Sequence, residues 1–180
     1  NKFGRTYLKE MQYCVDFAYA NRKLMMERVK AALQAVQPDV VFGDIINIAH
    51  NYAALETHFH KSVMIHRKGA TSAREGEVGI IPGSQGSPSY IVKGLGNTDS
   101  FTSCSHGAGR KMGRKQAQRQ LDLAQEKKKL DDQGIIHAIR HERDLDEAAG
   151  AYKNIDEVIE NQLDLVDVIV ELRPLAVIKG

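Results

Sequence analysis

The amino-acid sequence predicts a mixed α/β protein of the α+β kind, with one domain in which helices pack on a central β-sheet. Polar segments whose apolar residues recur with the period of a helix lie at the start of the chain and just after its middle. Runs of β-branched residues lie between these segments and at the C-terminal end. No internal repeat, low-complexity tract or flexible linker divides the chain. Its 180 residues are enough for one hydrophobic core.

The clearest helix is predicted over residues 7–35, and Gln37-Pro38 ends it because the residue before proline disfavours the helical region. Its apolar side chains recur three, four or seven residues apart, as expected for one helix face. They are Leu8, Met11, Val15, Ala18, Met25 and Val29. We expect this face to pack into the core.

The middle of the chain is predicted to be extended, with one short helical patch opening at residues 49–52. Candidate strands are 40–48, 63–66, 78–81 and 89–92. Residues 82–88 are rich in proline, glycine and serine, which predicts a tight loop between the last two strands.

A polar helix is predicted over residues 110–131, followed by a strand at 135–139. Asn154 is an expected N-cap, with Glu157 three residues later, so a further helix should begin there. The β-branched tail, residues 166–178, should pair into the sheet.

Composition narrows the class of protein. Hydrophobic residues make up 42% and charged residues 27%, which is usual for a water-soluble globular chain. No apolar run approaches the ~20 residues that span a bilayer, so we expect no membrane partner. Two distant cysteines, Cys14 and Cys104, are not a disulfide framework and suit a reducing cytoplasm, where we expect the protein.

Positive charge is concentrated in one stretch, although the formal net charge is only +2. Eight of the 25 lysines and arginines lie between residues 110 and 129: Arg110, Lys111, Arg114, Lys115, Arg119, Lys127, Lys128 and Lys129. Such local density steers a polyanion more effectively than the net charge suggests.

The run Ser103-Cys104-Ser105-His106-Gly107-Ala108-Gly109-Arg110 precedes this stretch. Its small residues let a ligand approach the backbone closely, and the cations suit a phosphate. A histidine presented to a phosphate can be a general acid, a metal ligand or a nucleophile that forms a phosphoramidate. The run also fits a plain glycine-rich turn before a solvated basic helix.

Several segments taken in order resemble a known family. They read Ile-Ala-His-Asn-Tyr at 48–52, His-Arg-Lys-Gly-Ala at 66–70, Ile-Pro-Gly-Ser-Gln-Gly at 81–86, the run at 103–110, Ala-Tyr-Lys at 151–153 and Val-Ile-Lys-Gly at 177–180. Together they resemble the C-terminal part of the RtcB family of RNA ligases, also called tRNA-splicing ligases. The resemblance implies that residues 1–180 are the C-terminal part of such a ligase domain, without its N-terminal part.

The resemblance implies a GTP- and Mn²⁺-dependent RNA ligase that acts in tRNA splicing or RNA repair. Such an enzyme joins an RNA 3′-phosphate or 2′,3′-cyclic phosphate end to a 5′-hydroxyl end, through a covalent histidine–GMP intermediate. His106 would be the nucleophile. The expected partners are RNA with these ends and an activating helper protein.

The resemblance also assigns roles to other residues. The guanylate would be contacted by Ser84, Ser89, His106, Gly107, Ala108, Gly109, Tyr152 and Lys179. His50 would be a manganese ligand, a role that suits a neutral imidazole. RNA phosphates would be bound by Lys68, Arg110 and Arg114.

The chain departs from the family pattern at two positions. Gln85 stands where a methionine is usual, and Gly113 stands where a serine is usual. The remaining metal ligands of the family belong to its N-terminal half, and their motifs are missing from this sequence. Two other functions therefore stay open: a non-catalytic module that binds guanine nucleotide or RNA, and a metal-dependent phosphoesterase.

Overall fold

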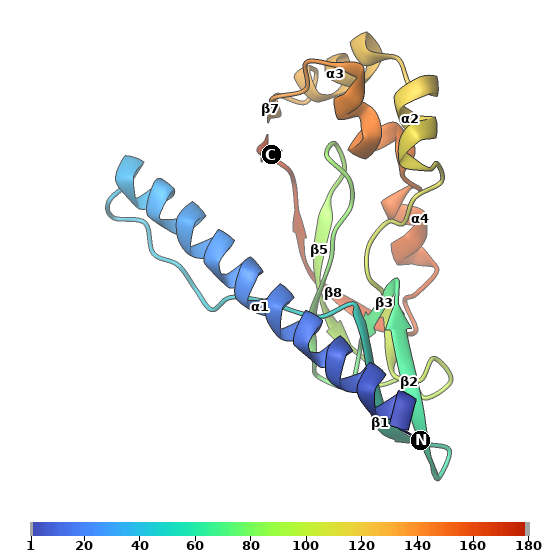
Figure 1. Ribbon diagram of the computed structural model, residues 1–180. Helices are drawn as coiled ribbons and strands as arrows, with labels where there is room; N and C mark the ends of the chain where they lie inside the picture. The colour runs from blue at the N-terminus through green and yellow to red at the C-terminus, as the bar shows by residue number, and fades with distance from the viewer. Residues whose placement is uncertain (1, 179–180) are drawn as a thin grey trace. The chain divides into compact units, whose positions relative to one another are not determined.

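The computed structural model describes residues 2–178, which form two compact units that divide between Thr71 and Ser72. Helices alternate with small sheets of two or three strands, so the predicted mixed α/β class is confirmed (Figure 1). Strand β3 (Ala70–Ser72) spans the division between the units.

The first unit consists of a long helix and a β-hairpin. Helix α1 (Lys2–Val36) contains the whole of the predicted helix and starts five residues earlier. Strands β1 (Asn51–His58) and β2 (Lys61–Lys68) pair antiparallel, with Asn51 opposite Lys68. The amide of Ala53 in β1 donates to Met11 Sδ at 3.0 Å, and the rings of Tyr7 and His66 stack at 6.0 Å, so α1 contacts both strands.

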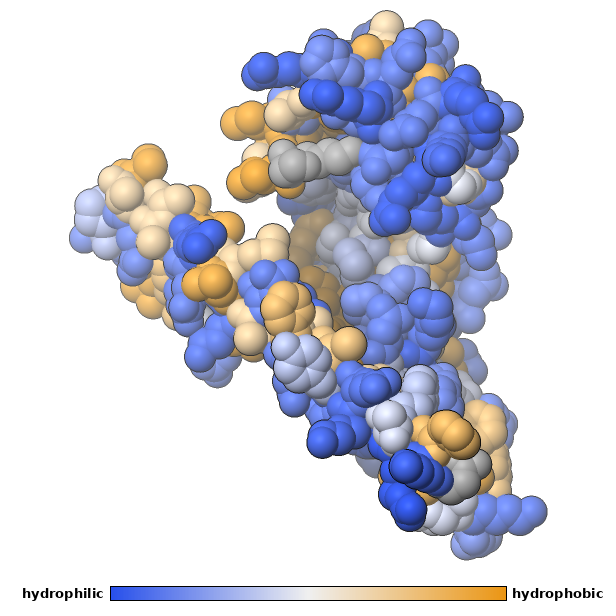
Figure 2. Space-filling model, viewed as in Figure 1, coloured by the Kyte–Doolittle hydropathy of each residue, from blue (hydrophilic) through white to orange (hydrophobic). Residues whose placement is uncertain are grey.

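The prediction that the apolar face of the first helix packs into a core is wrong for the described residues. No residue of α1 is buried, and Phe17 and Met25 are 64% and 58% exposed. Figure 2 shows hydrophobic side chains along this helix. A two-stranded hairpin is too narrow to cover a helix of 35 residues, which explains the exposure.

The prediction of a helical patch at residues 49–52 is also wrong. Asn51 begins β1 because each residue from Asn51 to His58 has a partner on β2. The two strands are joined by Phe59 and His60, which adopt φ values of 50° and 61°. Two successive positive values are typical of the tight turn that matches the twist of a hairpin.

The second unit is built on a three-stranded antiparallel sheet, in the order β4 (Val78–Ile81), β5 (Ser89–Gly94) and β8 (Val166–Leu172). These strands confirm the strands expected at 78–81 and 89–92 and the pairing of the tail. Helix α4 (Ile155–Glu160) buries Ile155 and Ile159 in the same core as the sheet residues. Asn154 caps it, since its side chain accepts from the amide of Asp156 at 3.0 Å.

The polar helix expected over residues 110–131 is two helices, α2 (Arg114–Gln120) and α3 (Leu123–Asp131). Leu121 and Asp122 between them are extended, and the Asp122 side chain caps α3 by accepting from the amide of Gln125 at 2.8 Å. A local hydrogen bond therefore breaks the periodic pattern, as aspartate does at helix starts.

Short elements complete the second unit. Strand β6 (Ser103–Ser105) precedes His106, and the 3₁₀ helices η1 (Glu142–Glu147) and η2 (Ala149–Ala151) follow α3. Strand β7 (Ile136–His137) pairs in parallel with β9 (Ala176–Val177). A second core lies here, formed by Leu130, Ile135, Ile139, Leu145 and Ala148.

Candidate functional site

Two loops predicted to bind a nucleotide meet in the second unit. The amide of Ala108 donates to the carbonyl of Pro82 at 3.0 Å, which joins the loop after His106 to the loop at 82–88. A Cβ on Gly107 would lie 3.0 Å from that same carbonyl oxygen, and one on Gly83 would lie 2.0 Å from the carbonyl oxygen of Pro88. Glycine at 83 is therefore required by the tight path of its own loop, whereas glycine at 107 permits the close approach of the two loops.

The serines of the first loop take part in its own hydrogen bonds. The amide of Gly83 donates to Ser89 Oγ at 3.3 Å, and the amide of Ser84 donates to Ser87 Oγ at 2.7 Å. The Ser84 and Ser87 hydroxyl groups also lie 2.8 Å apart. Both predicted guanylate contacts, Ser84 and Ser89, thus sit in a loop with a defined shape.

His106 is half-buried and directly follows β6. The residues before and after it in sequence are held by hydrogen bonds and burial. Before it, Cys104 is buried in the core and the amide of Ser105 donates to Gln162 Oε1 at 2.9 Å. After it, the Ser105 hydroxyl donates to the carbonyl of Gly107 at 2.7 Å. These contacts hold the backbone that carries the imidazole, which lowers the ordering cost of presenting the ring to a phosphate.

Four residues after His106, Arg110 belongs to a cluster of four side chains. We call this cluster the Glu147 clasp; its members are Arg110, Arg114, Glu147 and Tyr152. Arg110 Nη1 donates to Glu147 Oε2 at 3.0 Å and to Tyr152 Oη at 3.3 Å. Arg114 Nε donates to Glu147 Oε1 at 3.0 Å, and the Tyr152 hydroxyl donates to Glu147 Oε2. The Arg110 guanidinium also lies over the Tyr152 ring, 5.1 Å from its centre.

The clasp perturbs its own titrating groups. Burial alone would raise the pKa of Glu147, but the hydrogen bonds from Tyr152 and Arg114 and the charge of Arg110 lower it below its usual value. Burial raises the pKa of Tyr152, and the hydrogen bond and charge of Glu147 raise it further. The site therefore favours an ionised Glu147 beside a protonated phenol.

Backbone hydrogen bonds also connect the segments that carry the clasp residues. The amide of Lys153 donates to the carbonyl of Gly109 at 3.0 Å, and the amide of Lys111 donates to the carbonyl of Ala151 at 2.9 Å. Gly109 has a φ of 71°, which glycine adopts without strain. Tyr152 is thereby brought next to the loop that carries His106, although 46 residues separate the two in sequence.

The expected site residues divide between the two units. The second unit brings together Ser84, Ser89, His106, Gly107, Ala108, Gly109, Arg110, Arg114 and Tyr152. His50 and Lys68 belong to the first unit, where they lie at the same end of the hairpin because Asn51 pairs with Lys68. Lys179 lies outside the described residues.

The described residues do not by themselves fit a manganese site. Among residues 2–178, no group of three or more histidine, cysteine, aspartate or glutamate side chains could hold a metal ion. His50 alone cannot satisfy a cation of this kind, which needs several ligands. No helix in this part of the chain is both long enough and apolar enough to cross a membrane.

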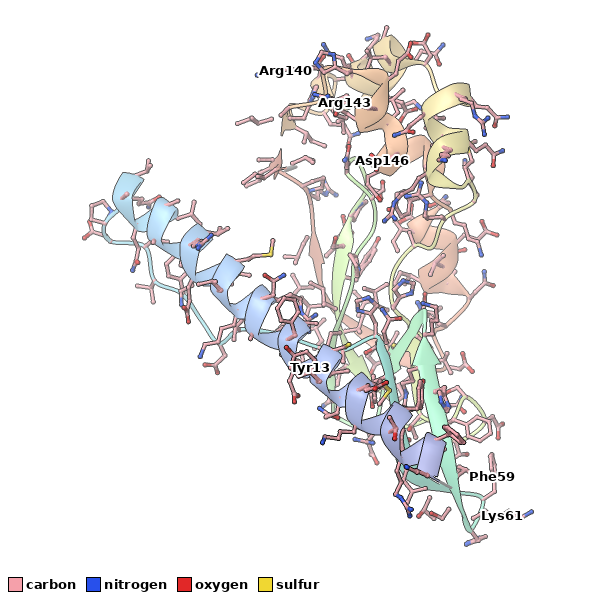
Figure 3. The ribbon with its side chains drawn as sticks, in the orientation of Figure 1. Tyr13, Phe59, Lys61, Arg140, Arg143 and Asp146 are labelled. Atoms are coloured by element: carbon pink, nitrogen blue, oxygen red, sulfur yellow. The ribbon has the colours of Figure 1, made fainter. Side chains whose placement is uncertain are left out.

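A cavity of about 640 Å³ is lined by Gln85 of the loop at 82–88. Gln85 lines it together with Arg140, Arg143 and Asp146, the last three of which are labelled in Figure 3. Gln85 Oε1 is buried there without a hydrogen-bond partner. Gln85 therefore puts a polar group at a position where the resemblance led us to expect an apolar methionine.

Sequence reasoning missed Glu147 and Gln162, which hold the residues it did find. Gln162, two residues after the end of α4, accepts a hydrogen bond from the amide of Ser105, and Glu147 in η1 accepts from Arg110. No helical or strand period marks either position. The only sequence clue to Glu147 is that an acidic residue precedes Tyr152 by five positions.

Comparison with known proteins identifies the family to which these loops belong. The family described as tRNA-splicing ligase RtcB matches residues 1–180. The chain belongs to the RtcB family. RNA-splicing ligase RtcB of Escherichia coli strain K12 is 43% identical over 180 residues, covering 97% of this chain and 43% of the relative.

More distant RtcB proteins match over a similar stretch. The tRNA-splicing ligase RtcB of Pyrococcus horikoshii is 33% identical over 204 residues, which cover 98% of this chain and 23% of the relative. RNA-splicing ligase RtcB of Mycobacterium tuberculosis is 34% identical over 200 residues, covering 98% and 45%. The chain thus spans less than half the length of the RtcB relatives it matches.

Proposed function

We propose that this chain is the C-terminal catalytic part of an RtcB-type RNA ligase, with residues 1–180 belonging to a larger ligase domain. The ligase would join an RNA 3′-phosphate or 2′,3′-cyclic phosphate end to a 5′-hydroxyl end, with GTP as energy source and Mn²⁺ as metal. The observation that carries the proposal is the meeting of the loops at 82–88 and 106–110 beside His106 in a member of this family.

The proposed chemistry has three transfers at phosphorus. An imidazole nitrogen of His106 attacks the α-phosphate of GTP, so that a P–N bond forms and pyrophosphate leaves. The RNA 3′-phosphate then takes the GMP, which breaks the P–N bond; a 2′,3′-cyclic end would first add water, which breaks the P–O2′ bond and leaves a 3′-phosphate and a 2′-hydroxyl. Finally the 5′-hydroxyl attacks the activated 3′-phosphate, loses its proton, and expels GMP. Histidine suits the first two transfers because it both attacks and leaves phosphorus readily.

The surrounding residues have distinct proposed roles. Ser84 and Ser89 would donate to the guanylate, and the backbone at residues 107–109 would line the phosphate. Tyr152 and Lys179 would contact guanine, for which a lysine can donate to O6. Lys68, Arg110 and Arg114 would bind RNA phosphates, and His50 would supply one manganese ligand while the other ligands come from elsewhere in the protein.

The partners proposed with this function are RNA carrying the ends named above and a helper protein that activates the ligase. The setting would be the cytoplasm, in tRNA splicing or RNA repair. The family name supports RNA as the substrate class, since relatives are called RNA-splicing or tRNA-splicing ligases.

The test is covalent labelling with α-³²P-GTP and Mn²⁺, applied to this chain and to a full-length protein that contains it. We expect an acid-labile, alkali-stable label on the full-length protein, which His106→Ala abolishes and His141→Ala leaves intact, since His141 is exposed in the same unit. A label that survives in His106→Ala would overturn the assignment of the nucleophile.

A binding module is the second candidate, and one observation favours it for the chain taken alone. No complete metal site is found within residues 2–178, so this chain by itself could hold guanine nucleotide or RNA without chemistry. If GTP binds reversibly but neither the chain nor the full-length protein is labelled, the binding module replaces the ligase.

A further inference from the structure

We propose that Glu147 is a positioning residue, which fixes Arg110 and Tyr152 against the His106 loop and keeps Arg114 paired until an RNA phosphate displaces it. This inference rests on the proposed function, because it explains how the residues expected to contact GTP and RNA are held beforehand. Glu147 itself was given no role by the sequence.

One carboxylate holds three expected substrate contacts at once. Glu147 Oε2 accepts from Arg110 Nη1 at 3.0 Å and from the Tyr152 hydroxyl, while Oε1 accepts from Arg114 Nε at 3.0 Å. Both oxygens are therefore occupied. A carboxylate that links two arginines and a phenol sets the distance between them, as supporting residues do in sites with a defined geometry.

Arg110 is held firmly in one place, so it would meet a phosphate without moving. Its Nε donates to the carbonyl of Met112 at 3.0 Å, and its Nη2 donates to the carbonyl of Asp146. Only 25% of its side chain is exposed. Because Arg110 follows Gly109 directly, these bonds tie the end of the His106 loop to η1.

Arg114 is held less firmly than Arg110. Its side chain is 71% exposed, and Glu147 Oε1 is the one acceptor described for it among residues 2–178. Exposed ion pairs contribute little and are screened by salt, so a phosphate can displace this one. Arginine also binds phosphate through two parallel hydrogen bonds, which compensates for the lost pair.

The charge of Glu147 predicts that its removal strengthens RNA binding, which is the opposite of what loss of a purely structural residue would do. Glu147 neutralises one of the two arginine charges in the clasp. Without its charge, the surface would attract a polyanion more strongly, and one more cation would be free to release counterions from RNA. A residue that only supported the fold would do the reverse, since its loss would disorder the arginines and weaken RNA binding.

The experiment compares Glu147→Gln with Glu142→Gln in the full-length protein. Both variants remove one negative charge from η1, but Glu142 is exposed and outside the clasp. RNA affinity is measured by fluorescence anisotropy with a single-stranded RNA that lacks ligatable ends, over a range of salt concentrations. GTP labelling is measured in parallel.

We expect Glu147→Gln to bind RNA several-fold more tightly at low salt, with a slope of log affinity against log salt steeper by up to ~0.7. We expect its labelling by GTP to slow at least tenfold. In an Arg114→Gln background, Glu147→Gln should no longer tighten RNA binding, because the freed cation is gone. Glu142→Gln should stay within twofold of the unsubstituted protein in both assays.

Weaker RNA binding by a folded Glu147→Gln, or equal behaviour of the two glutamine variants, would overturn the inference. If Glu147→Gln does not fold, Glu147→Asp keeps the charge and shortens the side chain. It should slow labelling while leaving the salt slope unchanged, and a change in slope without slower labelling would count against positioning.

A third readout needs neither RNA nor GTP. The pKa of the Tyr152 phenol, obtained by subtracting the absorbance titration of Tyr152→Phe, should fall in Glu147→Gln and stay unchanged in Glu142→Gln. An unchanged titration in Glu147→Gln would overturn the inference. If the unsubstituted protein neither labels nor binds RNA, the proposed ligase fails while this titration still decides the role of Glu147.

Discussion

At the scale of single residues, the second unit uses two phenols that donate to carboxylates. Tyr90 donates to Asp156 Oδ1 at 3.0 Å, which connects the sheet to the start of α4, and Tyr152 donates to Glu147. Burial, together with these hydrogen bonds, raises the pKa of both tyrosines. The hydrogen bond from Tyr152 also helps to lower the pKa of Glu147.

These shifts predict how stability depends on pH. A raised tyrosine pKa stabilises the fold below the unfolded value of 10.0, and that contribution is lost as pH rises through the folded pKa. The lowered pKa of Glu147 stabilises the fold above its unfolded value of 4.5 and is lost as pH falls through the folded pKa. Urea unfolding across pH should show both declines, with the alkaline one reduced in Tyr90→Phe/Tyr152→Phe. An alkaline decline equal to that of the unsubstituted protein would contradict the assignment.

At the scale of secondary-structure elements, α1 and the hairpin differ in what they bury. The hairpin buries Arg67, which donates to both oxygens of Glu56 at 2.6 and 3.0 Å. Helix α1 buries nothing among the described residues, although it carries aromatic and methionine side chains. Exposed apolar surface of this extent favours association in water.

This exposure predicts that the chain on its own aggregates through α1. Replacing Phe17 and Met25 together by glutamine should lower light scattering at a given concentration, because it removes two large apolar groups that are 64% and 58% exposed. Replacing the exposed Lys9 and Lys23 by glutamine is the control and should not lower scattering. A clean monomer before any substitution would show that α1 does not drive association.

At the scale of the whole molecule, some cationic side chains are paired with carboxylates and others are not. Among the eight cations between residues 110 and 129, Lys128 pairs with Asp132 at 2.7 Å, Lys129 pairs with Glu126, and Arg110 and Arg114 pair with Glu147. Lys111, Lys115 and Arg119 are exposed, and no carboxylate partner is seen for them within residues 2–178. These three are the cations most available to a polyanion.

RNA binding should therefore depend on these three side chains. Changing Lys111, Lys115 and Arg119 to glutamine should weaken binding of a single-stranded RNA and lower the slope of log affinity against log salt by about 2. The same change at Lys9, Lys23 and Arg28, which are exposed on α1, removes equal charge and should have a smaller effect. Equal losses in the two triple variants would mean that only total charge matters.

Much of the fold could be predicted because its signals are local. The β-branched runs gave β4 and β5, and Asn154 gave the start of α4. The break between α2 and α3 was missed because the capping bond of Asp122 outweighs a continuing helical period. The strand at Asn51 was missed because its pairing with β2 is a non-local interaction.

The candidate site divides in the same way. His106 and the loop at 82–88 could be found because glycine, serine and histidine form recognisable runs in the sequence. Glu147 and Gln162 could not, since both contact residues that are far away in sequence: Glu147 lies 37 residues from Arg110, and Gln162 lies 57 residues from Ser105. Such residues become visible only when their partners are seen beside them.

The division of the chain at Thr71 has a consequence for how such a gene can change over generations. The residues proposed to handle the nucleotide lie on one side of that point, whereas His50 and Lys68 lie on the other. Drift could therefore erode one set while selection preserves the other. In a descendant that kept only the later segment, the loops at 82–88 and 106–110 and the clasp would still be inherited together.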